Sequence, residues 1–244
     1  MKSLWDRRIA RAEELASKCA PAAELLSLYA RLASFQKEIF DALTVRPQAD
    51  PLAVRPYFPR LLELTARFGP PSNVKLPDAE LERLLIAHWN HEPVADERAR
   101  FVARALLQPF AEALAGRGTP IVDSSSGTCP FCGARPLAAV LRGEGDGGKR
   151  YLVCSLCATE WEFRRILCAN CGEEHKDNLP IYIAPEFDYI RVEACDSCKS
   201  YLKCIDLTRN GLAIAPADEI ASVALNVWAE ENGYVKIEPN LLGL

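Results

Sequence analysis

Apolar side chains recur every three or four positions through the first part of the chain. Between Leu25 and Leu43 they form a stripe with the period of an amphipathic helix. A proline-rich passage over residues 47–59 interrupts this pattern, because prolines are unfavourable in helix interiors. A short helix is predicted after it, and two longer helices are predicted over residues 78–90 and from 95 or 96 to about 115. We therefore predict an all-helical N-terminal domain over residues 1–116.

The pattern changes after a stretch of small and polar residues, 117–128, which is predicted to be a linker. Two later segments, 135–154 and 179–195, each consist of an apolar run, a turn and a second apolar run. Both are predicted to be β-hairpins. Helical spacing then resumes and stops near Gly233, so a C-terminal helix with an irregular tail is predicted within residues 208–244.

Composition and charge narrow the class of protein. The 244 residues are 49% hydrophobic and 25% charged, as in an ordinary globular protein large enough for two domains. A formal charge of −4 argues against broad attraction to nucleic acid or anionic membranes. The N-terminus lacks the apolar core of a signal peptide, and no apolar run reaches membrane-spanning length. A cytoplasmic location is therefore expected, where paired cysteines more often bind metal than form disulfides.

Nine of the ten cysteines lie between Cys129 and Cys204, and eight of them form four Cys-x-x-Cys pairs. The pairs are Cys129/Cys132, Cys154/Cys157, Cys168/Cys171 and Cys195/Cys198. The third pair follows the first by 39 positions (168 − 129), and the fourth follows the second by 41 (195 − 154). These intervals indicate one unit that occurs twice, over residues 129–167 and 168–207. Each unit consists of a cysteine pair, a hairpin, a second cysteine pair and an extra strand, which in the first unit covers residues 160–167.

A Cys-x-x-Cys turn places two thiolates on one side of a tight loop, and two such turns supply the four ligands of a tetrahedral metal site. Within the two units, 21 and 23 residues separate the cysteine pairs, close to the ~15 to 20 of paired zinc modules. We predict one site from each unit, with all eight paired cysteines as ligands. A site made from the two adjacent pairs, Cys154/Cys157 and Cys168/Cys171, is the alternative. Gly133 and Gly172, each directly after a second ligand, are expected to have positive φ.

The predicted fold is therefore α+β: an all-helical N-terminal domain, two tandem rubredoxin-like or zinc-ribbon β modules, and a C-terminal helix. Iron and zinc both accept four thiolates, so each site could hold either metal. Iron would allow the transfer of single electrons. A four-thiolate site has no open position for substrate, which favours a structural role over direct catalysis. A thioredoxin-like role is disfavoured because no pair lies in a βαβ context.

The remaining candidate residues receive ordinary structural interpretations. Cys204 is expected to be a small core residue rather than a ninth ligand, and Cys19 has no visible partner. His88 and His91 lack the spacing of a metalloprotease helix, so polar roles without a metal are favoured. His175 lies near a cysteine pair whose site already has four thiols.

Four segments resemble the formate dehydrogenase accessory protein FdhE family. They are "CPFCGARP", "KRYLVCSLCATEWEFRRILCANCG", "EACDSCKSYLKCIDL" and "DEIASVALNVWAEENGY", between residues 128 and 234. The resemblance implies a cytoplasmic protein that is needed for active formate dehydrogenase, acts on its catalytic subunit during maturation, and is not itself an enzyme. It also implies rubredoxin-like metal sites with the eight paired cysteines as ligands. The helical N-terminal part contains no matching motif.

The leading hypothesis is an accessory or chaperone-type protein that binds the formate dehydrogenase catalytic subunit, without nucleic acid and without stable membrane insertion. Trp161, Arg164 and Arg165 are candidate partner-binding residues, because aromatic and arginine side chains often anchor interfaces. A solvated strand face is the other interpretation of the two arginines. One alternative function is a rubredoxin-type redox protein acting on the metal centre of the client. A nucleic-acid-binding zinc ribbon is disfavoured, because residues 129–206 contain ten Lys/Arg against twelve Asp/Glu.

Overall fold

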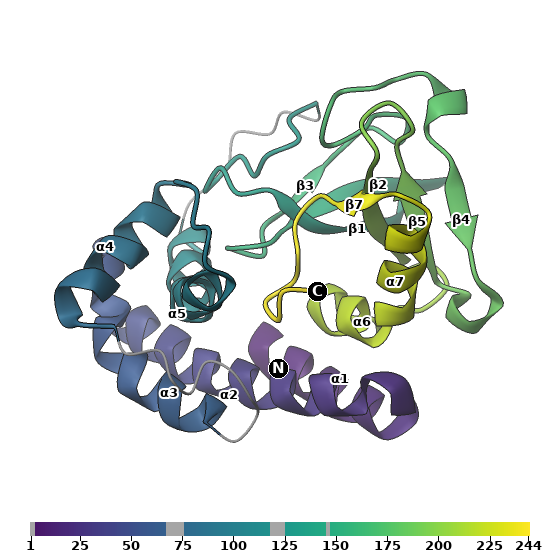
Figure 1. Ribbon diagram of the computed structural model, residues 1–244. Coiled ribbons are helices and arrows are strands. Elements are labelled where there is room, and N and C mark those ends of the chain that lie inside the picture. The colour runs from purple at the N-terminus through teal and green to yellow at the C-terminus, as the bar shows by residue number, and fades with distance from the viewer. Residues whose placement is uncertain (1–2, 67–75, 118–124, 145–146) are drawn as a thin grey trace.

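The computed structural model describes residues 3–66, 76–117, 125–144 and 147–244 (Figure 1). Most of the predicted linker, and the place where the short helix after the proline-rich passage was expected to end, lie outside these ranges. The N-terminal part is helical, as predicted. Its α-helices are α1 (Leu4–Lys18), α2 (Ala23–Val45), α3 (Phe58–Thr65), α4 (Asp78–Trp89) and α5 (Glu97–Ala115). No helix of the described residues is both long enough and apolar enough to cross a membrane.

Local sequence explains where these helices begin. Ser3 and Asp6 form a capping box at α1, in which the Ser3 hydroxyl accepts from the Asp6 amide at 3.0 Å. Asp96 caps α5 by accepting from the Ala99 amide at 2.7 Å. Asp78 lies in the first turn of α4, directly after the N-cap residue Pro77, where an acidic side chain is favourable. The proline-rich passage forms a 3-10 helix, Pro51–Tyr57, and three shorter ones cover Ala20–Ala22, Lys176–Asn178 and Pro185–Phe187.

The two repeats contribute to a single seven-stranded sheet in the described part of the chain. Its strands are β1 (Pro136–Glu144), β2 (Gly147–Cys154), β3 (Glu160–Glu162), β4 (Ile181–Ile183), β5 (Ile190–Ala194), β6 (Ser200–Asp206) and β7 (Val235–Lys236). Their order is β3-β2-β1-β6-β5-β4, with β7 beside β6. Each repeat supplies three antiparallel strands, and the repeats meet where β1 runs parallel to β6. The modules predicted as separate units are thus joined through their backbones.

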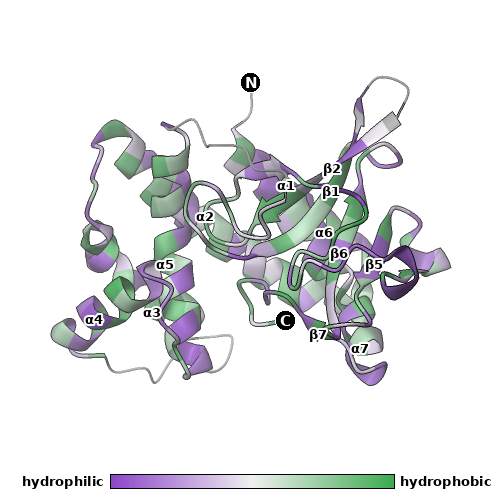
Figure 2. Cartoon of the chain, turned by 90° about the horizontal axis from the view of Figure 1, so that it is seen from above, coloured by the Kyte–Doolittle hydropathy of each residue, from purple (hydrophilic) through white to green (hydrophobic). Residues whose placement is uncertain are grey.

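Alternate residues of the central strands pack into two different cores. Ala139, Leu152 and Leu202 face the larger core, which also contains apolar side chains of α1, α2 and α5. Val140 belongs to the other core, with Leu225 and further residues of the C-terminal part. Figure 2 shows the hydrophobic colour along β1 and β2 within the body of the molecule. Because the larger core includes both helices and sheet, the predicted boundary near residue 116 does not separate two cores.

The predicted single C-terminal helix is two helices, α6 (Ala215–Ala221) and α7 (Val223–Glu231). The cause is Lys203, a fully buried lysine on β6. Its ammonium donates to the carbonyl oxygens of Glu219 at 2.5 Å and Ser222 at 3.2 Å. A cation that binds the last carbonyls of a helix stabilises its end, so the chain breaks at Ser222. The predicted helical segment is confirmed, but its spacing gave no signal for the break, because the lysine is distant in the chain.

The carboxylate of Glu219 lies between two lysines and is fully buried. Its oxygen is 2.8 Å from the ammonium of Lys203 and also contacts that of Lys236. Burial alone would raise the pKa of this carboxyl group, but the two ammonium groups lower it to about 2. A carboxyl pKa below its ordinary value stabilises the fold above about pH 4.5, and this contribution is lost as the pH falls toward 2.

We therefore expect Glu219→Gln to be less stable than the wild type at pH 6, with the difference shrinking as the pH falls from about 4.5 to about 2. Urea unfolding of both proteins at several pH values measures this difference. Glu230→Gln, at an exposed position of α7, serves as the control and should follow the wild type. Parallel acid profiles for wild type and Glu219→Gln would contradict the expectation.

Candidate metal centres

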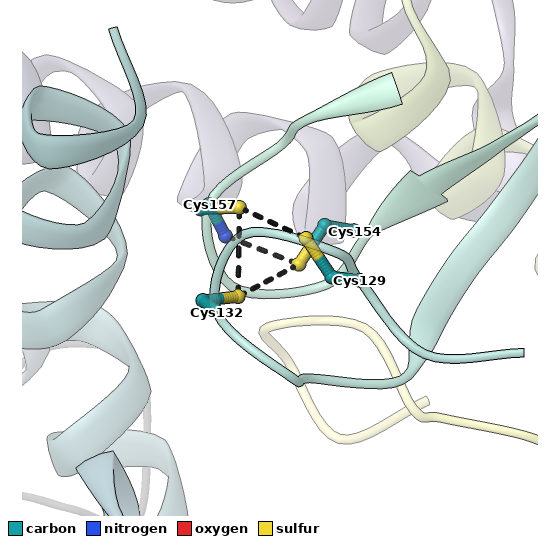
Figure 3. Close-up of side chains that lie close together, drawn as sticks. All are labelled: Cys129, Cys132, Cys154 and Cys157. Atoms are coloured by element: carbon teal, nitrogen blue, oxygen red, sulfur yellow. Dashed lines mark hydrogen bonds between the residues drawn. The ribbon is translucent and has the colours of Figure 1, made fainter. Parts of the chain in front are cut away.

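The first group of thiols lies between two loops at one end of the β1–β2 hairpin (Figure 3). One loop precedes β1 and carries Cys129 and Cys132, and the other follows from β2 and carries Cys154 and Cys157. The sulfur of Cys132 is 3.4 Å from that of Cys154 and 3.5 Å from that of Cys157. The sulfurs of Cys129 and Cys157 are 3.5 Å apart. All four sulfurs lie within 4.8 Å of one another.

The second group has the same construction around the β4–β5 hairpin. The sulfurs of Cys168 and Cys198 are 3.7 Å apart, as are those of Cys171 and Cys195. Each group therefore takes both cysteine pairs of one repeat, as the intervals predict, and the two adjacent pairs do not form a group together.

These distances test whether a metal ion fits. A disulfide would require about 2.05 Å between sulfurs, and all ten cysteines are free thiols. Four sulfurs at the corners of a tetrahedron, each about 2.3 Å from a central zinc ion, would lie about 3.8 Å apart. The sulfur–sulfur distances given above, 3.4 to 3.7 Å, are close to this value. Both groups could therefore hold a tetrahedral metal ion, and four thiol donors suit iron as well as zinc.

The four cysteine loops share one backbone conformation. In each, the amide of the first cysteine donates to the carbonyl five residues later, at 2.8 or 2.9 Å. The residue after the second cysteine has positive φ in every loop: Gly133 and Gly172 at 76°, and Ala158 and Lys199 at 55°. The prediction for the two glycines is confirmed. Left-handed backbone costs a non-glycine residue about 1 to 2 kcal/mol, and the conformation of Ala158 and Lys199 gave no signal in the sequence.

Backbone amides also point at the sulfurs. Cys154 accepts from the amides of Leu156 at 3.3 Å and Cys157 at 3.4 Å, and Cys168 accepts from that of Asn170 at 3.4 Å. Such donors favour the thiolate form, whereas burial raises the pKa of Cys154 and raises that of Cys168 to about 12. A bound cation would stabilise the thiolates that burial disfavours.

The two groups differ in exposure to solvent. Three cysteines of the first group are buried, and the fourth, Cys132, is half-buried. In the second group Cys171 is exposed and Cys198 is half-buried. The first group also belongs to the larger core through Cys129, Cys154 and Cys157. The first site is thus part of the main core, and the second lies near the surface.

Side chains of the helical part hold the first group in place. His91, after α4, lies with its Nε2 atom 2.5 Å from the carbonyl oxygen of Cys132. Gln108, on α5, donates from Nε2 to the carbonyl of Ser155 at 2.9 Å. His91 has a positive φ of 59°, which is rare for a residue with a side chain. The sequence contains no signal for either contact, because the partners are 41 and 47 residues apart.

The segment between the two sites is arranged differently from the predicted strand. β3 ends at Glu162, although the amide of Phe163 still donates to the carbonyl of Arg150 at 2.9 Å. Trp161 is only 2% exposed, and its indole donates to the carbonyl of Ser126 at 2.9 Å. Its burial removes it from any exposed partner-binding face. Arg164 and Arg165 are exposed, with Arg164 paired to Glu174 at 2.7 Å, and their partner-binding role stays a prediction.

The other candidates have local roles. Cys204 is 1% exposed in the larger core and belongs to neither group of four. The Cys19 thiol contacts the carbonyl of Ala221 at 3.4 Å, a partner that the sequence did not reveal. His175 is exposed and lies 3.8 Å from Asp177.

Comparison with known proteins identifies relatives of this chain. The family model "FdhE, central domain" matches residues 128–165, and "FdhE, C-terminal domain" matches residues 166–242. A protein FdhE homolog of Aquifex aeolicus is 34% identical over 195 residues, which are 77% of this chain and 69% of the relative. A homolog of Pseudomonas aeruginosa is 40% identical over 152 residues, covering 58% of this chain and about half of the relative, 48%.

The likeness extends to the fold. The crystal structure of the FdhE protein from Pseudomonas aeruginosa superimposes with a TM-score of 0.72 at 28% identity, covering 98% of this chain and 95% of that one. The superposition includes the helical N-terminal part, for which the sequence offered no motif. The two family models, the Aquifex aeolicus relative and the shared fold together show that the chain belongs to the FdhE family.

Proposed function

We propose that this chain is a cytoplasmic accessory protein that binds the catalytic subunit of formate dehydrogenase during maturation and is not itself an enzyme. The proposal is carried by one observation: two groups of four thiols are positioned by the strands of a single sheet. Filled by metal, such sites have no open coordination position for a substrate. Membership of the FdhE family points to formate dehydrogenase as the client.

The eight paired cysteines are the proposed ligands of two metal ions, iron or zinc. The first ion would cross-link the loops at the end of β2 to those before β1 within the main core. The second would do the same around the β4–β5 hairpin near the surface. Metal coordination of this kind contributes to folding directly. A rigid surface would then be presented to the client.

The proposed contact with the client lies on the exposed segment between the two sites. Arg164 and Arg165 are exposed, and Ile166 beside them is 52% exposed. Arg165 also lines a hollow together with Ile181, an apolar residue of the edge strand β4 that is 55% exposed. Arginine and large apolar side chains together are typical of protein interfaces.

The test is retention of purified formate dehydrogenase catalytic subunit on the immobilised, metal-loaded protein. We expect the wild type to retain it, and the double variant Arg164→Ala/Arg165→Ala to retain at least tenfold less. The double variant Arg46→Ala/Arg98→Ala changes two exposed arginines of the helical part and should behave like the wild type. If the wild type retains no more subunit than empty resin, the proposed function fails.

A redox role is the second candidate, favoured by the exposure of Cys171 at the second site. Electron transfer to a client requires a metal near the surface, and this site has one exposed ligand. Iron-loaded protein should then show a thiolate-to-iron absorption band that disappears on reduction and returns on oxidation. Protein isolated from its own cells with zinc alone would end this candidate.

A further inference from the structure

A cavity of about 530 Å³ lies beside the first group of thiols and contains none of the eight paired cysteines. Its walls come from the end of α4, the start of α5, the loops that carry the first group, and the chain after β7. This volume is within the range of small-molecule sites, roughly 300 to 1,000 Å³. The cavity is thus lined by residues that are far apart in the sequence. Its lining includes no proposed metal ligand and neither arginine of the proposed client contact.

Arg104, on α5, is a buried cation in the wall of this cavity, and one of its donors has no partner among the described residues. The residue is 3% exposed. Its Nη1 atom donates to the carbonyl of Asn240 at 3.1 Å and lies 3.4 Å from the carboxylate of Glu238. Its Nη2 atom is buried and has no hydrogen-bond partner among the described residues. Buried donors on charged groups are normally satisfied, so this atom calls for an acceptor from outside the chain.

The charges around the cavity favour an acceptor with a single negative charge. Three arginines, Arg100, Arg104 and Arg135, line it together with two carboxylates, Glu92 and Glu238. Among the lining side chains, the excess is one positive charge. Burial and the nearby arginines lower the pKa of His88, which also lines the cavity, to about 4, so this imidazole adds no charge near neutral pH.

Much of the remaining wall is apolar, and specific contacts position it. Val94, Leu156 and Pro239 supply aliphatic surface. The Arg100 side chain donates twice to the Val94 carbonyl, from Nε at 3.3 Å and from Nη2 at 3.1 Å, which holds this wall against α5. His91, also in the wall, contacts the Cys132 carbonyl at 2.5 Å, so the cavity adjoins the backbone of the first metal site.

We propose that this cavity binds a monocarboxylate with an apolar body, the carboxylate on the free Nη2 of Arg104 and the body against Val94, Leu156 and Pro239. The carboxylate belongs either to a free acid or to an acidic side chain of a polypeptide, and the chemistry of recognition is the same. The site does not depend on the identity of the client protein.

Calorimetric titration of the full-length, metal-loaded protein tests this site with four probes: acetate, hexanoate, inorganic phosphate, and a capped pentapeptide with one glutamate between leucines. Hexanoate should bind several-fold tighter than acetate for each methylene group that it buries. Phosphate, a mixture of monoanion and dianion at neutral pH and without an apolar body, should bind more weakly than hexanoate. Tighter binding of the peptide than of hexanoate would assign the carboxylate to a polypeptide, and the reverse order would assign it to a free acid.

Two substitutions with opposite expected effects identify the site. Arg104→Gln should weaken hexanoate binding at least tenfold, because it removes the buried cation. Glu238→Gln should strengthen binding several-fold, because it removes the carboxylate that competes for Arg104. Arg98→Gln, an exposed arginine on the same helix that does not line the cavity, should change nothing.

If Arg104→Gln does not fold, Glu238→Gln decides, since Glu238 is partly exposed. The proposal is overturned if neither hexanoate nor the peptide binds the wild type at tens of millimolar, or if Glu238→Gln leaves affinity unchanged. Phosphate that binds as tightly as hexanoate would also overturn it.

Discussion

Cys154→Ser is expected to remove the metal from the first site and to prevent stable folding of the chain. Cys154 is 2% exposed, accepts two backbone amides and belongs to the larger core. A four-cysteine metal site contributes on the order of 10 kcal/mol to folding, whereas domains are stable by only about 5 to 15 kcal/mol. Loss of the ion would therefore remove most of the free energy of unfolding of the chain. Elemental analysis and urea unfolding measure the two effects.

Two cysteine variants provide matched controls. Cys171→Ser changes an exposed ligand of the second site, so it should also lose one metal ion but keep the larger core folded. Cys204→Ser changes a buried cysteine outside both groups, so it should keep two metal ions per chain. Two metal ions per chain in Cys154→Ser would refute the ligand assignment. If Cys154→Ser binds one metal ion and is as stable as the wild type, the first site does not contribute most of the free energy of unfolding.

Asp218→Ala is expected to reduce the free energy of unfolding by about 3 to 5 kcal/mol, the usual effect of breaking a buried ion pair. The Asp218 side chain is completely buried and accepts from Arg11 on α1 at 2.6 and 3.0 Å. It also accepts from the Tyr189 hydroxyl at 2.8 Å and from the Ile214 amide at 2.7 Å. Removing the carboxylate leaves the Arg11 guanidinium, which is itself largely buried, without its main partner.

The matched control changes the other acid that contacts the same arginine. Glu14 lies 3.1 Å from Arg11, but its side chain is 38% exposed. Glu14→Ala should therefore cost less than about 1 kcal/mol, as exposed ion pairs do. Replacing Arg11 and Asp218 together by apolar residues should recover part of the loss, because neither group is then buried alone. Equal urea midpoints for Asp218→Ala and Glu14→Ala would show that the buried contact between Arg11 and Asp218 contributes no more to stability than the exposed one.

The features that could be predicted from sequence depend on short intervals. The stripe of α2 repeats every three or four residues, and each cysteine loop is complete within six. The grouping of the eight thiols followed from two nearly equal intervals. Trp161 lies in the extra strand predicted over residues 160–167, where it could be buried in the core, while its residue type suggested an interface anchor. Packing decides between these, because an indole in the core buries more apolar surface than one at the rim.

The features that could not be predicted depend on residues distant in the chain. The parallel pairing of Ala139 with Cys204 joins two repeats whose local patterns do not specify their relative position. The break at Ser222 requires an ammonium from β6. The cavity combines side chains from residue 88 to residue 239, and no local pattern marks its arginines as different from surface arginines.

The two repeats are joined head to tail where β1 pairs with β6 in parallel. Such a junction could in principle be repeated by adding further units at either edge of the sheet. At the centre, the first strand of the first repeat, β1, pairs with the last strand of the second repeat, β6. The edge strands are the last strand of the first repeat, β3, and the first strand of the second repeat, β4, so another copy could pair with them in the same way. At the centre these strand positions have nine and seven residues, but at the edges each has only three. Truncated edges leave too few backbone groups for another chain to pair with. The short edge strands therefore disfavour the addition of a second copy to either edge of the sheet, although the junction at its centre is of a kind that could repeat.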